Sequence, residues 1–154
     1  IEQITEKKVT SVHEEIKQTD FDFLKIKSAT AGKVSAPEMV AKLMCNEGKI
    51  DRECFWVLHL NTANSIIEKE LVSMGIVNSA LIHPREIFRK AIMNGTVSIL
   101  TVHNHPGDQV NPSKQDLEVW NKLDESGKII GIEIIDHLII TPSGNYYSKK
   151  ENRD

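Results

Sequence analysis

Cysteine is scarce in this chain, and basic residues do not outnumber acidic ones. Only Cys45 and Cys54 occur among 154 residues, so we expect reduced thiols with structural roles rather than a disulfide framework. The 19 Lys and Arg residues against 22 Asp and Glu residues give a formal net charge of -3. This balance argues against nucleic acid as the main partner, because phosphate binding normally needs clustered basic side chains.

Long hydrophobic runs, internal repeats and low-complexity segments are also missing. No apolar run approaches the roughly 18 residues of a membrane-spanning helix, and no signal-peptide pattern follows a basic amino terminus. The sequence therefore predicts a cytoplasmic protein without a membrane partner. What is present is the composition of one ordinary globular domain, with 40% hydrophobic and 27% charged residues.

The beginning of the chain differs in pattern from the rest. Residues 1–20 are mostly polar or charged, with a thin apolar stripe at helical spacing, and residues 21–29 alternate in part like a short strand. We therefore predict an amino-terminal arm or docking helix plus a short strand over 1–28, a domain over 29–150 and a tail over 151–154.

Helical and strand patterns interleave within the predicted domain. Helical periodicity occurs in three segments, at 36–47, 85–94 and 113–127. Strand patterns occur at 53–61, 65–75, 96–103, 129–141 and around 146–147. In the helices, Ser35 to Glu38 matches a capping box, Ile92 and Leu117 are expected on buried faces, and Gly127 is expected to end the third helix. The order predicts an α/β fold of the α+β type, with helices on a mixed sheet that contains a hairpin.

Two histidines and an aspartate have the spacing of a metal site. His103 and His105 end a predicted buried strand, where residues two apart point to the same side. Asp116 lies in the first turn of the next helix, where a carboxylate is favoured and leans back toward the helix entrance. Each residue alone is usually incidental, but two imidazoles and a carboxylate together are typical of a catalytic Zn2+ site with an open fourth position.

Other enzymes that use a His-x-His pair do not fit the chain. An amidohydrolase barrel needs about 250 residues, which exceeds this length. The HExxH motif of zincins is absent, as are the HxE and CxxC motifs of zinc deaminases.

Four short segments together resemble the RadC-like branch of the JAMM metallopeptidase family, which is also called MPN+ or JAB. They are "HPREIF" at 83–88, "HNHP" at 103–106, "NPSKQD" at 111–116 and "IIDHLIIT" at 134–141. The resemblance covers residues 35–150. One departure is visible, because RadC-like chains usually read His-Pro-Ser-Gly-Asp, whereas Gly107 here follows Pro106 directly.

The resemblance implies a JAB/MPN-like (cytidine-deaminase-like) architecture, in which a curved mixed sheet is flanked by helices and zinc is held by His103, His105 and Asp116. It also implies a glutamate as general base. Glu53 is favoured because the base of the family precedes a buried strand. Glu86 is the competing candidate, although an acidic residue at the start of a helix also has a capping explanation.

Other residues near the motif receive weaker assignments. The resemblance makes Ser113 a candidate donor to the developing oxyanion, and its alternative role is to cap its own helix. Asn104 is expected to point away from the metal and to stabilise the loop. Asp136 and His137 are expected to form structural hydrogen bonds, with support of a metal ligand as the alternative.

The function expected from the resemblance is a zinc-dependent peptidase or isopeptidase that acts on a peptide or protein substrate. The alternative is a non-enzymatic interaction module associated with DNA repair, a label that RadC-like proteins carry. A metal-dependent nuclease is weaker still, because the sequence shows neither a second metal site nor a basic groove. A second copy of the chain is a further candidate partner.

Overall fold

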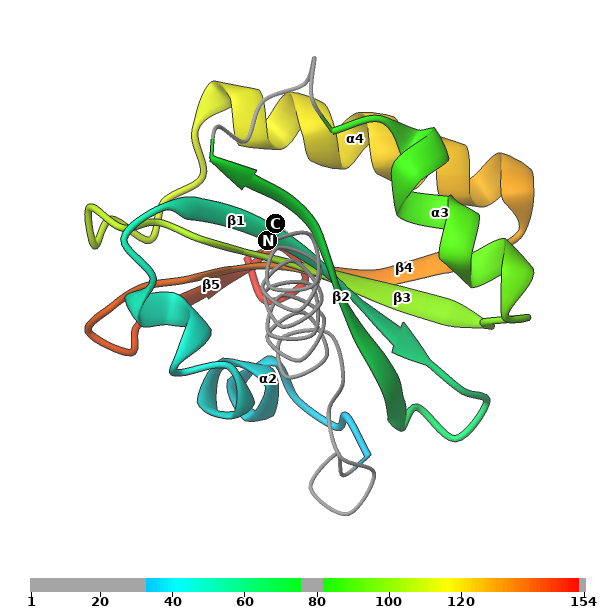
Figure 1. Ribbon diagram of the computed structural model, residues 1–154, viewed down its shortest axis with the longest axis horizontal. Coiled ribbons are helices and arrows are strands. Elements are labelled where there is room, and N and C mark those ends of the chain that lie inside the picture. Colours follow the sequence, from blue (N-terminus) through cyan, green and yellow to red (C-terminus); the bar gives the residue numbers. More distant parts are fainter. Residues whose placement is uncertain (1–32, 76–81, 153–154) are drawn as a thin grey trace, which may run out of the picture.

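The computed structural model describes residues 33–75 and 82–152, so the arm and strand predicted over 1–28 lie outside the described residues. A five-stranded sheet in the order β2-β1-β3-β4-β5 forms the centre (Figure 1). Its strands are β1 (Glu53–Leu60), β2 (Ile66–Gly75), β3 (Ser98–Asn104), β4 (Glu133–Ile140) and β5 (Tyr146–Ser148). Strands β3 and β4 are parallel, and all other neighbours are antiparallel. The predicted mixed sheet with flanking helices is therefore confirmed.

Helices cover both faces of this sheet. Helices α3 (Pro84–Met93) and α4 (Lys114–Ile130) lie on one side, and α2 (Pro37–Leu43) lies on the other (Figure 1). Strand β1 shows why both faces need a cover, since its side chains from 54 to 60 are all buried. Phe55 and Val57 pack toward α3 and α4, whereas Trp56 and Leu58 pack toward α2. None of the helices in the described part of the chain is long and apolar enough to cross a membrane.

The predicted hairpin is present between β1 and β2, which pair antiparallel from Glu53–Gly75 to Leu60–Ile66. Its turn is held by Asn61, whose side-chain oxygen accepts hydrogen bonds from the backbone N–H groups of Ala63 and Ser65. This turn lies at the end of β1 that is opposite to Glu53.

The first helix is shorter than the pattern predicted. Helix α2 ends at Leu43, and a separate 3-10 turn follows over Glu47–Lys49. The predicted capping box is wrong, because Pro37 starts the helix one residue later and makes Ala36 the N-cap, without a side-chain cap. After the helix the chain turns at Gly48, where an added Cβ would lie 2.8 Å from the carbonyl oxygen of Thr141.

Two residues predicted to be buried are exposed, and one predicted helix end is wrong. Ile92 is 59% exposed and Leu117 is 42% exposed. The face of each helix that packs on the sheet is narrower than the apolar stripe in its sequence, so these two residues lie outside the contact. Helix α4 continues through Gly127 and ends before Gly131, whose φ of 84° suits the left-handed cap. Gly127 is instead a point of close approach, since an added Cβ would lie 2.7 Å from the carbonyl oxygen of Ile132.

Candidate metal centre

His103 lies near the end of β3, and His105 directly follows the last residue of this strand. His103 faces the side of the sheet that carries α4, where its ring stacks on Phe55 and contacts Trp120 at centroid distances of 5.9 and 6.0 Å. Its exposed fraction is only 1%. His105 follows the strand, and its backbone N–H donates to the carbonyl of Ile140 at 3.0 Å. Pairing with β4 thus keeps both rings on the same side of the sheet.

The aspartate of the motif is placed by the first turn of α4. The hydroxyl of Ser113 accepts a hydrogen bond from the N–H of Asp116 at 3.1 Å. In return, Asp116 Oδ2 accepts one from the N–H of Ser113 at 2.8 Å. This reciprocal capping box fixes the carboxylate at the helix entrance, where the macrodipole favours negative charge.

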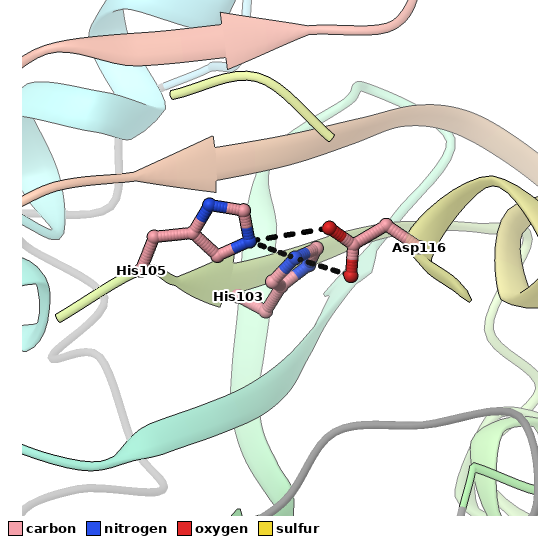
Figure 2. A group of neighbouring side chains, drawn as sticks. All are labelled: His103, His105 and Asp116. Atoms are coloured by element: carbon pink, nitrogen blue, oxygen red, sulfur yellow. Dashed lines mark hydrogen bonds and ion pairs between the residues drawn. The ribbon is translucent and has the colours of Figure 1, made fainter. Parts of the chain in front are cut away.

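The three side chains converge on one point (Figure 2). The Nε2 atoms of His103 and His105 are 3.1 Å apart. Asp116 Oδ1 lies 3.2 Å from the first of these atoms, and Asp116 Oδ2 lies 3.2 Å from the second. One ligand atom from each residue lies within 4.8 Å of the others, and the group could hold a metal ion.

The separations of these three ligand atoms fit a tetrahedral ion such as Zn2+. Four ligand atoms at about 2.05 Å from a tetrahedral ion are about 3.3 Å apart, close to the separations seen here. His105 Nδ1 lies 2.6 Å from the carbonyl oxygen of Gln109, to which its N–H donates. With a metal ion bound, Nε2 would carry no hydrogen and its lone pair would be available to the ion. Such a hydrogen bond behind a histidine is usual for a metal ligand.

Electrostatics keep the aspartate ionised. Burial acts to raise the pKa of Asp116, but hydrogen bonds from His103 and His105, together with the N–H of Ser113, hold this pKa well below its usual range. For His105, burial acts to lower the pKa, but its bonds to Asp116 and to the Gln109 carbonyl raise it above its ordinary value. The cluster therefore presents a fixed negative charge that favours a cation.

A pocket of about 570 Å³ opens beside the cluster. Its walls come from the head of β1, the loop after β3 and the start of α4, and they include Glu53, His105, Pro106, Gly107, Gln109, Asn111, Pro112, Ser113, Gln115 and Asp116. Glu53 is half-buried there, and its negative charge contributes to the raised pKa of His105. Ser113 is exposed. The pocket thus brings both favoured catalytic candidates next to the candidate ligands.

The competing base does not share this pocket. Glu86 is exposed in the first turn of α3 and is not among the residues that line it. A second hollow of about 520 Å³ lies between α3 and α4, with Arg85 and Arg89 among mostly apolar walls. Its lining contains neither histidine nor carboxylate, so it offers no general acid or base.

The remaining site candidates form hydrogen bonds within the fold. The Asp136 carboxylate accepts from the hydroxyl of Ser148 at 2.5 Å and from the N–H of Lys150 at 2.9 Å. His137 lies 2.5 Å from the hydroxyl of Thr101 and 2.7 Å from Asp124 Oδ1. Neither residue has a hydrogen bond to a candidate ligand within the described residues. These hydrogen bonds are consistent with the structural role expected for Asp136 and His137.

In the loop between His105 and Asp116, the residue with left-handed backbone conformation is Asp108, one position after Gly107. Asp108 has a φ of 66°, whereas the φ of Gly107 is not positive. Asp108 Oδ1 accepts a hydrogen bond from the N–H of Ser143 at 3.0 Å, which ties the loop to the turn after β4. Sequence reasoning missed this contact and also Gln109, which acts through its backbone carbonyl and so leaves no signal in its side-chain type.

The same stretch of the chain has recognisable relatives. The sequence profile of the RadC-like JAB domain matches residues 34–154. The chain belongs to the RadC-like JAB domain family. The resemblance to this family is therefore confirmed for the whole of the described fold.

Individual relatives carry the name UPF0758 protein. The one from Finegoldia magna is 44% identical over 115 residues, which cover 74% of this chain and 52% of the relative. The one from Methanosarcina mazei is 42% identical over 120 residues, covering 77% and 52%. The one from Desulforudis audaxviator is 45% identical over 108 residues, covering 70% and 47%. The chain thus spans about half the length of these relatives, whose names state no activity.

Proposed function

We propose that this RadC-like JAB domain is a zinc-dependent hydrolase of peptide or isopeptide bonds. The observation that carries the proposal is the convergence of two imidazole nitrogens and one carboxylate in a pocket that also contains Glu53. His103, His105 and Asp116 would hold the ion and leave a fourth position for water or substrate. The JAB family supports hydrolytic chemistry in general.

When bound to His103, His105 and Asp116, zinc would supply a Lewis acid able to polarise a carbonyl group and to lower the pKa of a water ligand to about 7. The protein's own side chains then divide the remaining work. Glu53 takes a proton from the attacking water and later returns it to the leaving amine. The Ser113 hydroxyl uses its oxygen to accept from the N–H of Asp116, so its hydrogen remains able to point toward the developing oxyanion.

Metal content of the purified protein tests the first half of this proposal. We expect one zinc ion per chain in the wild type and none in the variant that combines His103→Ala with His105→Ala. His83→Ala is the matched control, because His83 is exposed and caps α3 away from the pocket. Equal zinc content in the wild type and the double variant would reject the site.

Hydrolysis tests the second half. A library of internally quenched peptides and lysine isopeptides is incubated with the zinc-loaded protein, and cleavage is followed by fluorescence. We expect cleavage that the double histidine variant does not support. A chain that binds zinc but cleaves no member of the library would contradict the hydrolase and favour the interaction module.

A further inference from the structure

We propose that Asn104 is a positioning residue that holds Glu53 next to the metal ligands, an inference that rests on the proposed function. Asn104 lies between the two histidines, and its side chain points to the opposite face of the sheet. There its Oδ1 accepts a hydrogen bond from the N–H of Cys54 at 2.7 Å. Its Nδ2 donates to the carbonyl oxygens of Arg52 at 2.8 Å and of Ile50 at 3.1 Å.

These bonds connect β3 to the backbone on both sides of the base. The regular pairing of β1 with β3 ends at Phe55 and His103. Beyond this pair, the Asn104 side chain bonds to the residue before Glu53 and to the residue after it. Asn104 is fully buried, so water does not compete for these bonds. The strand that carries the histidines therefore also fixes the backbone from which Glu53 projects.

The pattern of bonds requires an amide. An asparagine side chain offers two N–H donors and one acceptor oxygen, and all three are used here. An aspartate of the same shape keeps the bond to Cys54 but turns an oxygen toward the carbonyls of Ile50 and Arg52. Alanine makes none of the three bonds. The two substitutions at Asn104 thus remove the connection in different ways.

Asn61 provides a matched control at the other end of β1. Its side chain also binds backbone groups, the N–H groups of Ala63 and Ser65, but these belong to the hairpin turn. Asn61→Ala removes two side-chain hydrogen bonds to the backbone from the turn that directly follows β1, without touching the pocket. Any effect specific to Asn104→Ala then reflects the location of its bonds.

The first measurement is amide hydrogen exchange in the metal-free protein, followed residue by residue by NMR. In Asn104→Ala we expect exchange at Cys54 to be at least about 10-fold faster than in the wild type, because its N–H loses its partner. Exchange at Leu58, in the middle of β1, should remain within about 2-fold. Zinc content should stay at the wild-type value, because no candidate ligand atom bonds to the Asn104 side chain.

The second measurement is turnover of the library peptide that the wild type cleaves fastest. We expect Asn104→Ala to lower kcat by about 100-fold with KM within about 3-fold, since a catalytic group displaced by about 1 Å can cost that much. Asn61→Ala should leave both constants unchanged. Glu53→Gln combined with Asn104→Ala should lose no more activity than Glu53→Gln alone, because both changes disable the same base.

Several results would overturn the positioning role. Unchanged exchange at Cys54, loss of zinc from Asn104→Ala, or a loss of kcat that adds to that of Glu53→Gln would each do so. Where the alanine variant fails to fold, Asn104→Asp serves instead, and because it keeps the bond to Cys54 it is judged by its zinc content and its loss of kcat, not by exchange at Cys54. Failure of both variants to fold would assign Asn104 to stability alone. A library without any cleaved peptide rejects the proposed hydrolase, while exchange at Cys54 and zinc content still decide whether Asn104 fixes the backbone at residue 53.

Discussion

Glu53 reaches the pocket from β1, whereas the three candidate ligands all lie between residues 103 and 116. The proposed binding of a metal and the proposed activation of water can therefore be tested by separate substitutions. We expect Glu53→Gln to lower kcat by roughly 10²- to 10⁴-fold, the usual contribution of a general base, and to keep its zinc. Glu86→Gln should change neither, because Glu86 is exposed outside the pocket. A loss of kcat in the second variant, measured on the same peptide, would restore Glu86 as the base.

The displaced glycine of the ligand loop has no special backbone requirement. Gly107 has no positive φ, and nothing lies within 4 Å of an added Cβ. We expect Gly107→Ser to change the free energy of unfolding by less than about 0.5 kcal/mol, as measured in urea, with zinc content unchanged. Asp108→Ala is the contrasting variant and should be clearly more destabilising than Gly107→Ser, because it keeps a φ of 66° and loses the bond to Ser143. Equal changes in the free energy of unfolding for the two variants would contradict this difference between Gly107 and Asp108.

Helix α4 contains a glycine where packing outweighs helix propensity. Alanine in a helix interior is favoured over glycine by about 1 kcal/mol. At Gly127, however, the added Cβ would lie 2.7 Å from the carbonyl oxygen of Ile132, which belongs to the backbone. We therefore expect Gly127→Ala to destabilise the protein by roughly 1–3 kcal/mol in thermal or urea unfolding. Ser126→Ala, one residue earlier at a half-buried position, should be neutral or slightly stabilising. A stabilising Gly127→Ala would show that the helix can shift.

Elements were predictable where the signal is local. The capping box of Ser113 and Asp116 spans four consecutive positions, so the start of α4 and the direction of the carboxylate followed from the sequence. Whether Ile92 and Leu117 are exposed depends on which other elements cover their helices. The spacing of apolar residues within one helix cannot predict this. The sequence predicts a helix end at Gly127 because glycine commonly follows the last helical turn. Its actual packing partner, the carbonyl group of Ile132, lies beyond the helix and gives no local signal.

The same distinction applies to the site. The three ligands were predicted because they are close in sequence and have the spacing of a strand end and a helix start. Which of Glu53 and Glu86 lies beside the candidate ligands depends on the antiparallel pairing of β1 with β3, which places the head of β1 beside His103. No local pattern fixes that pairing. Asn104 was expected to stabilise the loop, but its three partners lie at residues 50, 52 and 54 and could not be named from the sequence.

A buried hydrogen-bond chain makes the whole molecule sensitive to acid. It runs from Thr101 on β3 through His137 on β4 to Asp124 on α4, where Lys149 also binds the carboxylate at 2.6 Å. Burial lowers the pKa of His137, although Asp124 acts in the opposite direction. Burial acts to raise the pKa of Asp124, but hydrogen bonds from His137 and Lys149 outweigh it and lower the pKa to about 2.

Both shifts have the same sign for stability. An unfolded histidine takes up its proton near pH 6.5, above the native pKa of His137, so the unfolded chain binds more protons as the pH falls below about 6.5. Asp124 adds a further loss below about pH 4. We expect the His137 contribution to lower the free energy of unfolding in urea from pH 7 to pH 5, by up to about 1.4 kcal/mol per pH unit, while the raised pKa of His105 acts in the opposite direction. His137→Gln should flatten this dependence, and parallel curves for the two proteins would contradict the contribution.

Zinc should act on the stability of the complete domain. A ligand that binds only the folded state stabilises it by about 2.7 kcal/mol when its free concentration is 100 times Kd. We therefore expect zinc to raise Tm in a calorimetric scan, a chelator to reverse the increase, and the variant with His103→Ala and His105→Ala to show none. An equal increase in that variant would place the bound metal elsewhere.

The contacts in the candidate site join residues at very different separations in the sequence, and this difference affects the order in which the site can assemble during folding. His105 and Asp116 are 11 positions apart, whereas the contact between Cys54 and Asn104 spans 50. Closing the longer loop costs about 1.3 kcal/mol more in chain entropy. During synthesis β1 emerges first and has no partner on the β3 side until some forty further residues have been added. A nascent or refolding chain can thus bring its three candidate ligands together within one short segment, whereas the proposed base joins them only after the central strands have paired.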